Sequence, residues 1–225
     1  MISFTLVHGP ATVETGIRSI NELVETIAGD RKTEAVLLGA LAQLHAMAGD
    51  FDEARGLYRR GQTILAELGA GIDALTTSID SSRVELLAGD LATAEAELRR
   101  DHDALEALGE TYFRSTIAGL LAHVLLRAGR LDEASDFAAT AEKISESDDL
   151  FSTVLWQTAR ARIRAEAGDP EAVTLAESAA ALARGTADLE LEADVNLREA
   201  FALYDRKGDR VSASAHRENA AATSA

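Results

Sequence analysis

The sequence predicts an all-α protein: a right-handed α-α superhelix of about five helix pairs of 39–40 residues, preceded by a leading half-repeat. The first observation is a turn, Ala128–Ala134, in which an apolar helix runs into a glycine and a new helix starts at once. Similar turns are centred on five glycines that lie 40, 40, 39 and 40 residues apart: Gly49, Gly89, Gly129, Gly168 and Gly208. A fixed period of this size is typical of a helical solenoid.

A second set of glycines, offset by 20 residues, closes the other helix of each pair: Gly29, Gly69 and Gly109. The third observation is composition, because alanine, leucine, glutamate and arginine dominate and all four favour helices. The glycines divide the chain into eleven expected helices, at 10–28, 32–48, 51–68, 72–87, 91–108, 111–128, 131–146, 150–167, 170–184, 187–206 and 209–221.

The start of the chain lacks a helical pattern, so we expect residues 1–9 to form an extended lead-in. Pro10 fits the first turn of a helix, where its missing N–H costs nothing. One repeat domain is expected over residues 10–221, with a frayed tail at 222–225. The first helix of this domain is the unpaired half-repeat.

An aspartate follows four of the turn glycines: Asp50, Asp90, Asp169 and Asp209. Its side chain can accept hydrogen bonds from the free N–H groups of the next helix. Asp50 and Glu53 also have the spacing of a capping box. Arg130 breaks the rule, which leaves Asp132 or water to cap the helix that follows it.

The turn and its flanks resemble the tetratricopeptide repeat (TPR). That motif has a small residue seven positions before the turn glycine, as in Ala42, Ser82, Ala122 and Ala161. It has an alanine five positions after the glycine, matched by Ala54, Ala94, Ala134 and Ala213, with Ala172 four positions after. A third small position is approximated by Gly61, Ala141, Ala179 and Ala220, and Asp101 departs from it. The resemblance implies closely packed helix pairs.

Two segments, Leu105–Ala134 and Val154–Gly168, also resemble the C-terminal repeat region of large actinobacterial signalling ATPases of the adenylate/guanylate-cyclase-like or LuxR-type kind. This resemblance implies a role in signal transduction or transcription regulation. The chain lacks a G-x-x-x-x-G-K-[ST] loop, a cyclase aspartate pair and a basic recognition helix. It would therefore carry only the sensory or scaffolding part of such a regulator.

The charge balance argues against two classes of partner. The chain has 38 acidic residues against 22 lysines and arginines, for a net charge of −16. Nucleic acids and anionic membranes both require a basic surface, so we expect neither as a partner.

There is no cysteine, and no apolar run reaches the ~20 residues of a membrane span. We expect a cytoplasmic protein.

No catalytic, cofactor-binding or metal-binding residues are predicted. The five histidines lack metal-ligand spacing, and no serine has the context of a nucleophile. His45 and His123 lie within repeat helices, where a hydrogen-bonded packing role is expected, and Trp156 is expected in the core. The chain is therefore predicted not to be an enzyme.

One stripe of residues is a candidate binding surface. In the TPR, the first helix of each pair lines a concave groove, and the position six residues before the turn glycine faces it. This position holds polar residues, and the position three residues later holds apolar ones, Ala46, Leu86, Leu126 and Ala165. The groove-binding candidates are Gln43, Arg83, Leu86, His123, Leu126 and Arg162. The alternative is a solvated helix face.

Two functions follow as hypotheses. The first is a non-enzymatic scaffold that binds a protein or peptide in its groove. The second is a small-molecule effector sensor, with an apolar pocket bounded by Leu86, Leu126 and Trp156 and entered by Arg83 or Arg162. The sequence leaves homo-oligomerisation open.

Overall fold

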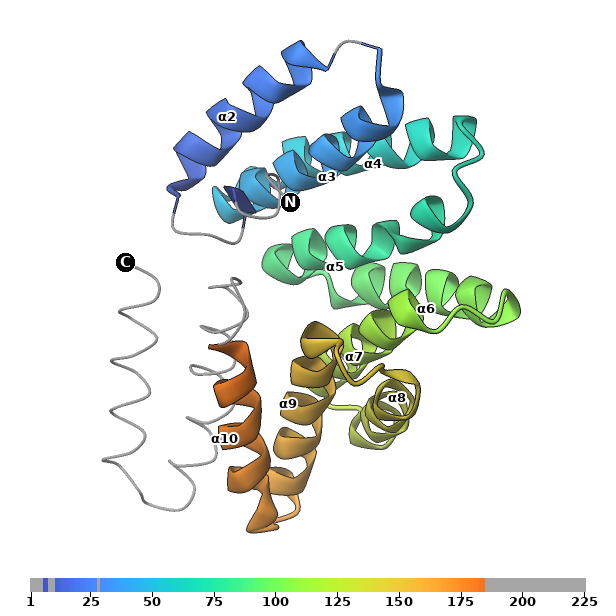
Figure 1. The fold of residues 1–225 in the computed structure, drawn as a ribbon. Coiled ribbons are helices and arrows are strands. Elements are labelled where there is room, and N and C mark those ends of the chain that lie inside the picture. Colours follow the sequence, from blue (N-terminus) through green and yellow to red (C-terminus); the bar gives the residue numbers. More distant parts are fainter. Residues whose placement is uncertain (1–5, 8–10, 28, 185–225) are drawn as a thin grey trace. The chain divides into compact units, whose positions relative to one another are not determined.

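The computed structural model describes residues 6–7, 11–27 and 29–184, and in these residues it contains nine α-helices, one 3-10 helix and no strand (Figure 1). The helices expected at 187–206 and 209–221, together with Gly208 and Asp209, lie outside the described residues. The chain consists of two compact units, Met1–Ile117 and Ala118–Ala225.

The observed elements follow the predicted ones closely. They are α2 (Val13–Thr26), α3 (Arg31–Met47), α4 (Phe51–Glu67), η1 (Gly71–Thr76), α5 (Thr77–Ala88), α6 (Leu91–Ala107), α7 (Tyr112–Arg127), α8 (Leu131–Ile144), α9 (Leu150–Glu166) and α10 (Glu171–Ala183). This confirms the all-α prediction for the described residues. None of these helices combines the length and apolar character that crossing a membrane requires.

The same backbone hydrogen bond occurs at six of the described glycine turns, those of Gly49, Gly69, Gly89, Gly109, Gly129 and Gly168. The residue after the glycine donates its N–H to the carbonyl five positions before it, as Asp50 does to His45 at 2.8 Å and Arg130 does to Leu125 at 2.9 Å. This bond requires the intervening residue to be left-handed, and Gly129 has φ +76°. The glycine ladder therefore marks helix ends because glycine adopts this conformation without strain.

The aspartate caps are confirmed at two positions and wrong at one. Asp90 accepts from the backbone N–H of Thr93 at 3.0 Å and from its hydroxyl at 2.8 Å, and these bonds lower the pKa of Asp90. Asp169 accepts from the backbone N–H of Glu171 at 2.9 Å. Asp50 makes no capping hydrogen bond, so the predicted capping box does not form. Its carboxylate lies 3.6 Å from the Nδ1 atom of His45 instead.

A buried aspartate caps α9, and it provides a test of this chemistry. Asp149 accepts from the N–H of Ser152 at 3.0 Å. We expect Asp149→Ala to lower the free energy of unfolding by about 1 to 2 kcal/mol, because a helix N–H loses its acceptor. Asp50→Ala, at a helix start without a side-chain cap, should stay within about 0.5 kcal/mol. Urea denaturation measures both, and equal losses would contradict the capping role.

The small residues of the repeat pattern are all buried where the structure describes them. The alanines after the turn glycines are Ala54, Ala94, Ala134 and Ala172, and the small residues before them are Ala42, Ser82, Ala122 and Ala161. At the third position a Cβ on Gly61 would lie 3.0 Å from the carbonyl oxygen of Ala35. These positions are therefore small because neighbouring helices approach closely.

Two segments differ from expectation. The helix predicted at 72–87 begins as the 3-10 segment η1, because Gly71 has φ +48° and the hydroxyls of Thr76 and Thr77 donate to carbonyls three residues back. Near the start of the chain, Leu6 and Val7 are helical where an extended lead-in was expected. Val7 is buried in a hydrophobic cluster with Ile20.

Candidate functional site

In the first unit the residues of the candidate stripe form a hydrogen-bonded contact between α3 and α5, which are the first helices of two successive pairs. Gln43 of α3 is only 6% exposed, and its Nε2 donates to the Oδ1 of Asp80 on α5 at 2.9 Å. The Nη1 of Arg83 donates to the Oε1 of Gln43 at 3.4 Å. Arg83 and Leu86 are both partly exposed on α5. The structure thus brings Gln43 and Arg83 together, as the 40-residue spacing predicted.

In the second unit the stripe is also tied to a neighbouring helix. The Nε2 of His123 on α7 lies 2.9 Å from the carbonyl oxygen of Leu155 and 3.1 Å from the hydroxyl of Thr158, both on α9. This confirms the hydrogen-bonded packing role expected for His123. Arg162 is partly exposed on α9 and makes no hydrogen bond or ion pair with any residue that the structure describes.

The apolar half of the stripe does not form one exposed surface. Leu126 is 3% exposed and packs in a hydrophobic cluster with Ala122, Leu125 and Ala138, so its side chain serves the core of the second unit. Ala46 is likewise buried, whereas Leu86 keeps part of its surface accessible. Trp156, expected in the core, is partly exposed on α9, and its indole Nε1 is buried without a partner among the described residues.

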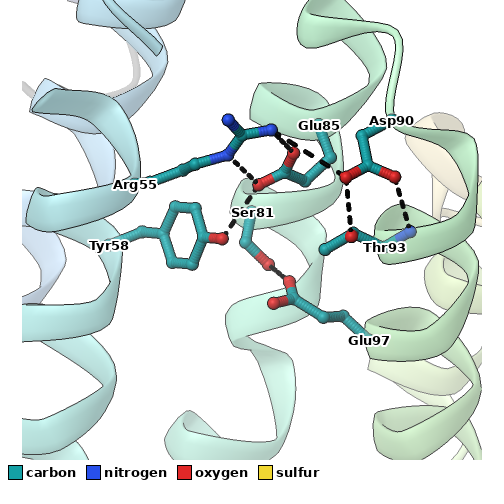
Figure 2. A network of polar contacts seen from close by, with 7 residues as sticks. All are labelled: Arg55, Tyr58, Ser81, Glu85, Asp90, Thr93 and Glu97. Atoms are coloured by element: carbon teal, nitrogen blue, oxygen red, sulfur yellow. Dashed lines mark hydrogen bonds and ion pairs between the residues drawn. The ribbon is translucent and has the colours of Figure 1, made fainter. Parts of the chain in front are cut away.

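Sequence reasoning missed a buried ion pair between α4 and α5. Figure 2 shows Arg55 and Tyr58 reaching from α4 to Glu85 on α5, a carboxylate with 0% exposure. The Nε and Nη2 of Arg55 donate to the two oxygens of Glu85 at 2.9 and 2.5 Å, and the hydroxyl of Tyr58 donates to Oε1 at 2.9 Å. Because three donors converge on this carboxylate, its burial is compensated.

The same face of α5 makes polar contacts with α6. The hydroxyl of Ser81 donates to the carboxylate of Glu97, and burial raises the pKa of Glu97 (Figure 2). The backbone N–H of Ser78 donates to the carboxylate of Asp101 at 3.0 Å. Burial also raises the pKa of Tyr58. The hydrogen bonds that Arg55 donates to Glu85 raise the pKa of Arg55, so both side chains remain donors at neutral pH.

A pattern in the sequence could have revealed this polar face. Its residues Ser78, Ser81, Ser82 and Glu85 are spaced as one side of a helix. Forty residues later the same positions hold Ala118, Leu121, Ala122 and Leu125, all buried. Polar residues aligned with buried apolar ones indicate a buried network. Because Glu85 is bound by donors from α4 and Ser81 donates to Glu97 on α6, the network links helices rather than presenting a reactive group.

No metal-binding cluster of histidine, cysteine, aspartate and glutamate residues occurs in the described part of the chain. No protein-family model and no curated protein matches the sequence.

Solved structures do match. BtubC (BKLC) from P. vanneervenii superposes with a TM-score of 0.64 and 18% identity, over 94% of this chain and 87% of that one. Two structures of a putative kinesin light chain with TPR-like repeats from Podosopora anserina follow. One, a point variant, has a TM-score of 0.57 and 19% identity over 86% and 96% of the chains, and the other 0.55 and 18% over 87% and 97%. At these identities the likeness shows the fold, an all-α solenoid of TPR-like repeats.

Proposed function

We propose that this TPR-like solenoid is a non-enzymatic scaffold that binds a protein or peptide through the first helices of its pairs. The observation that carries the proposal is the repeated position six residues before the turn glycine. It places Arg83 and Arg162, both partly exposed, on the first helices of two repeat pairs. Helical solenoids commonly bind their partners along extended surfaces to which several repeats contribute.

The partner's chemistry follows from these side chains. A guanidinium offers a planar fork of donors that matches a carboxylate. The chain carries a net charge of −16, which repels partners with diffuse negative charge. We therefore expect a peptide segment that presents single carboxylates together with apolar groups, one of which could contact Leu86.

The cellular setting belongs to the same proposal. The resemblance of Leu105–Ala134 and Val154–Gly168 to the repeat region of actinobacterial signalling ATPases supports a place in signalling or transcription regulation, in the cytoplasm. In that setting the chain would recruit a partner to a regulator rather than catalyse a reaction.

Replacing both arginines tests the scaffold. Arg83→Ala with Arg162→Ala should weaken the binding of partners captured from a native lysate about a hundredfold or more, since each arginine contributes a charge-assisted hydrogen bond worth about 1.5 kcal/mol or more. The free energy of unfolding should fall by no more than about 1 kcal/mol. Affinity capture with mass spectrometry identifies the partner, biolayer interferometry measures its affinity, and urea denaturation measures stability.

The matched control removes the same charge from helices that are not the first of a pair. Arg18 on α2 and Lys143 on α8 are exposed, and replacing both with alanine should leave partner binding unchanged. If the arginine variant binds as tightly as this control, the first helices are merely solvated. If the arginine variant loses several kcal/mol of stability, Arg83 and Arg162 serve packing between repeats.

A second candidate function is a small-molecule effector sensor. It is favoured by a cleft in the first unit whose lining contains carboxylates as well as apolar groups. This cleft differs from the pocket expected from Leu86, Leu126 and Trp156. Thermal shift of the whole chain against a metabolite panel tests the sensor. A stabilising ligand whose effect survives the double arginine substitution would separate this function from the scaffold.

A further inference from the structure

A cleft of about 100 Å³ opens in the first unit between α3, α4, η1 and α5. Glycines let the helices approach there: a Cβ on Gly39 would lie 2.9 Å from the Oδ2 of Asp80. The cleft has room for about three waters at ~30 Å³ each, so it suits one side chain or a small molecule.

The two threonine hydroxyls of the lining already donate their hydrogens to the backbone. Thr76 donates to the carbonyl of Asp73 at 3.1 Å, and Thr77 donates to that of Ala74 at 3.2 Å. The Nε2 of Gln62 donates to the hydroxyl oxygen of Thr77 at 3.3 Å. Because a hydroxyl has one hydrogen and two lone pairs, these threonines meet a ligand chiefly as acceptors.

Two carboxylates complete the polar lining. The Oδ1 of Asp80 accepts from the Nε2 of Gln43 at 2.9 Å. Asp73 already binds an ammonium of this chain, since the Nζ of Lys32 lies 2.7 Å from its Oδ2. The lining is therefore rich in acceptors and negative charge, and one of its carboxylates is seen to accept an ammonium.

The remainder of the cleft is apolar. Val36 and Leu65 line it, and Val36 is 50% exposed. A ligand that fits has an aliphatic stem and a head with donors only. An ammonium carries three donors and no acceptor. A carboxylate would be repelled by Asp80, and a guanidinium fork would need both oxygens of Asp80, one of which already accepts from Gln43.

We propose that this cleft binds a primary alkylammonium group, with the ammonium on Asp80 and the stem against Val36 and Leu65. The group is either a lysine side chain of a peptide or a free alkylamine. This inference gives the second candidate function a ligand class. It stands apart from the first-helix scaffold, so loss of partner binding in the arginine variant would leave it intact.

Nuclear magnetic resonance titration of the whole ¹⁵N-labelled chain tests the proposal with three probes. n-Butylammonium and Nα-acetyl-lysine N-methylamide should both shift the amides of Gly39, Thr77 and Asp80. The norleucine analogue of the blocked lysine, which lacks the ammonium, should not. Tighter binding of the blocked lysine than of n-butylammonium would identify a peptide as the source, and equal binding would identify a free amine.

Asp80→Asn removes the charge and keeps an amide oxygen for Gln43. It should weaken probe binding about tenfold, as expected for one charge-assisted contact. Asp52→Asn, on the exposed first turn of α4, makes the same change outside the cleft and should bind the probes normally.

A second substitution keeps the test decisive if Asp80→Asn disturbs the fold. Val36→Lys places a tethered ammonium at the cleft and should abolish binding of both ammonium probes, whereas Val36→Met should retain it. The proposal is overturned if neither ammonium probe shifts the cleft amides, if the norleucine analogue binds equally well, or if folded Asp80→Asn protein binds like the wild type.

Discussion

Replacing Glu85 with alanine should lower the free energy of unfolding by about 3 kcal/mol, the low end of the range for breaking a buried ion pair. The substitution leaves the guanidinium of Arg55 and the hydroxyl of Tyr58 without their common acceptor. Since Arg55 is partly exposed, water can recover some of its hydrogen bonds, which holds the loss at this end of the range. Urea denaturation followed by circular dichroism measures the change.

A surface ion pair in the same unit supplies the control. The carboxylate of Glu67 lies 2.9 Å from the guanidinium of Arg31, with both side chains about half exposed. Glu67→Ala should cost no more than about 1 kcal/mol. Similar losses for the two glutamates would mean that the contact between α4 and α5 depends on apolar packing and not on the buried carboxylate.

Glycine-to-alanine substitutions should have opposite signs at two helical positions. A Cβ on Gly119 of α7 would lie 2.8 Å from the Cβ of Leu155 on α9, closer than packed side chains approach. Gly119→Ala gains helix propensity, but the clash forces the helices apart and should produce a net loss of about 1 to 3 kcal/mol.

Gly56 of α4 has open space around its Cβ position, so only the propensity term acts there. Gly56→Ala should raise the free energy of unfolding by about 0.5 to 1 kcal/mol. Thermal denaturation of the two variants measures both effects. Stabilisation by Gly119→Ala would show that α7 and α9 are not closely packed at this point.

The helix boundaries could be predicted from the sequence because their cause is local. A left-handed glycine and the backbone bond that spans it need only a few neighbouring residues, as the turn at Gly129 illustrates. The start of α5 could not be predicted in the same way. There Gly71 is also left-handed, and the hydroxyl groups of Thr76 and Thr77 compete for backbone carbonyls.

The candidate stripe was harder to predict because exposure depends on how helices cross. Leu86 and Leu126 occupy the same repeat position, yet the first is partly exposed and the second is packed in a core cluster. The position of Gln43 and Arg83 beside each other followed from the repeat period. The engagement of Gln43 by Asp80 did not, because it depends on the three-dimensional approach of α3 and α5.

Asp101, which departs from the small-residue pattern of the repeat, is explained by its contacts. It receives the backbone N–H of Ser78 and the Nε of Arg100, the latter at 2.7 Å. The repeat motif shows only that a small residue is missing at this position. The hydrogen bond from Ser78 on α5 explains why an aspartate can be buried there.

The polar face of α5 bears on the order in which look-alike helices assemble. Faces made of alanine and leucine would accept any neighbour of similar shape, and mispairing is a characteristic failure of repeat proteins. On α5, by contrast, Glu85 requires Arg55 and Tyr58 of α4, while Ser81 requires Glu97 of α6. A wrong neighbour would bury charged groups without partners. The polar face of α5 therefore makes its pairing with α4 and α6 specific, which fixes the order of these helices in the array.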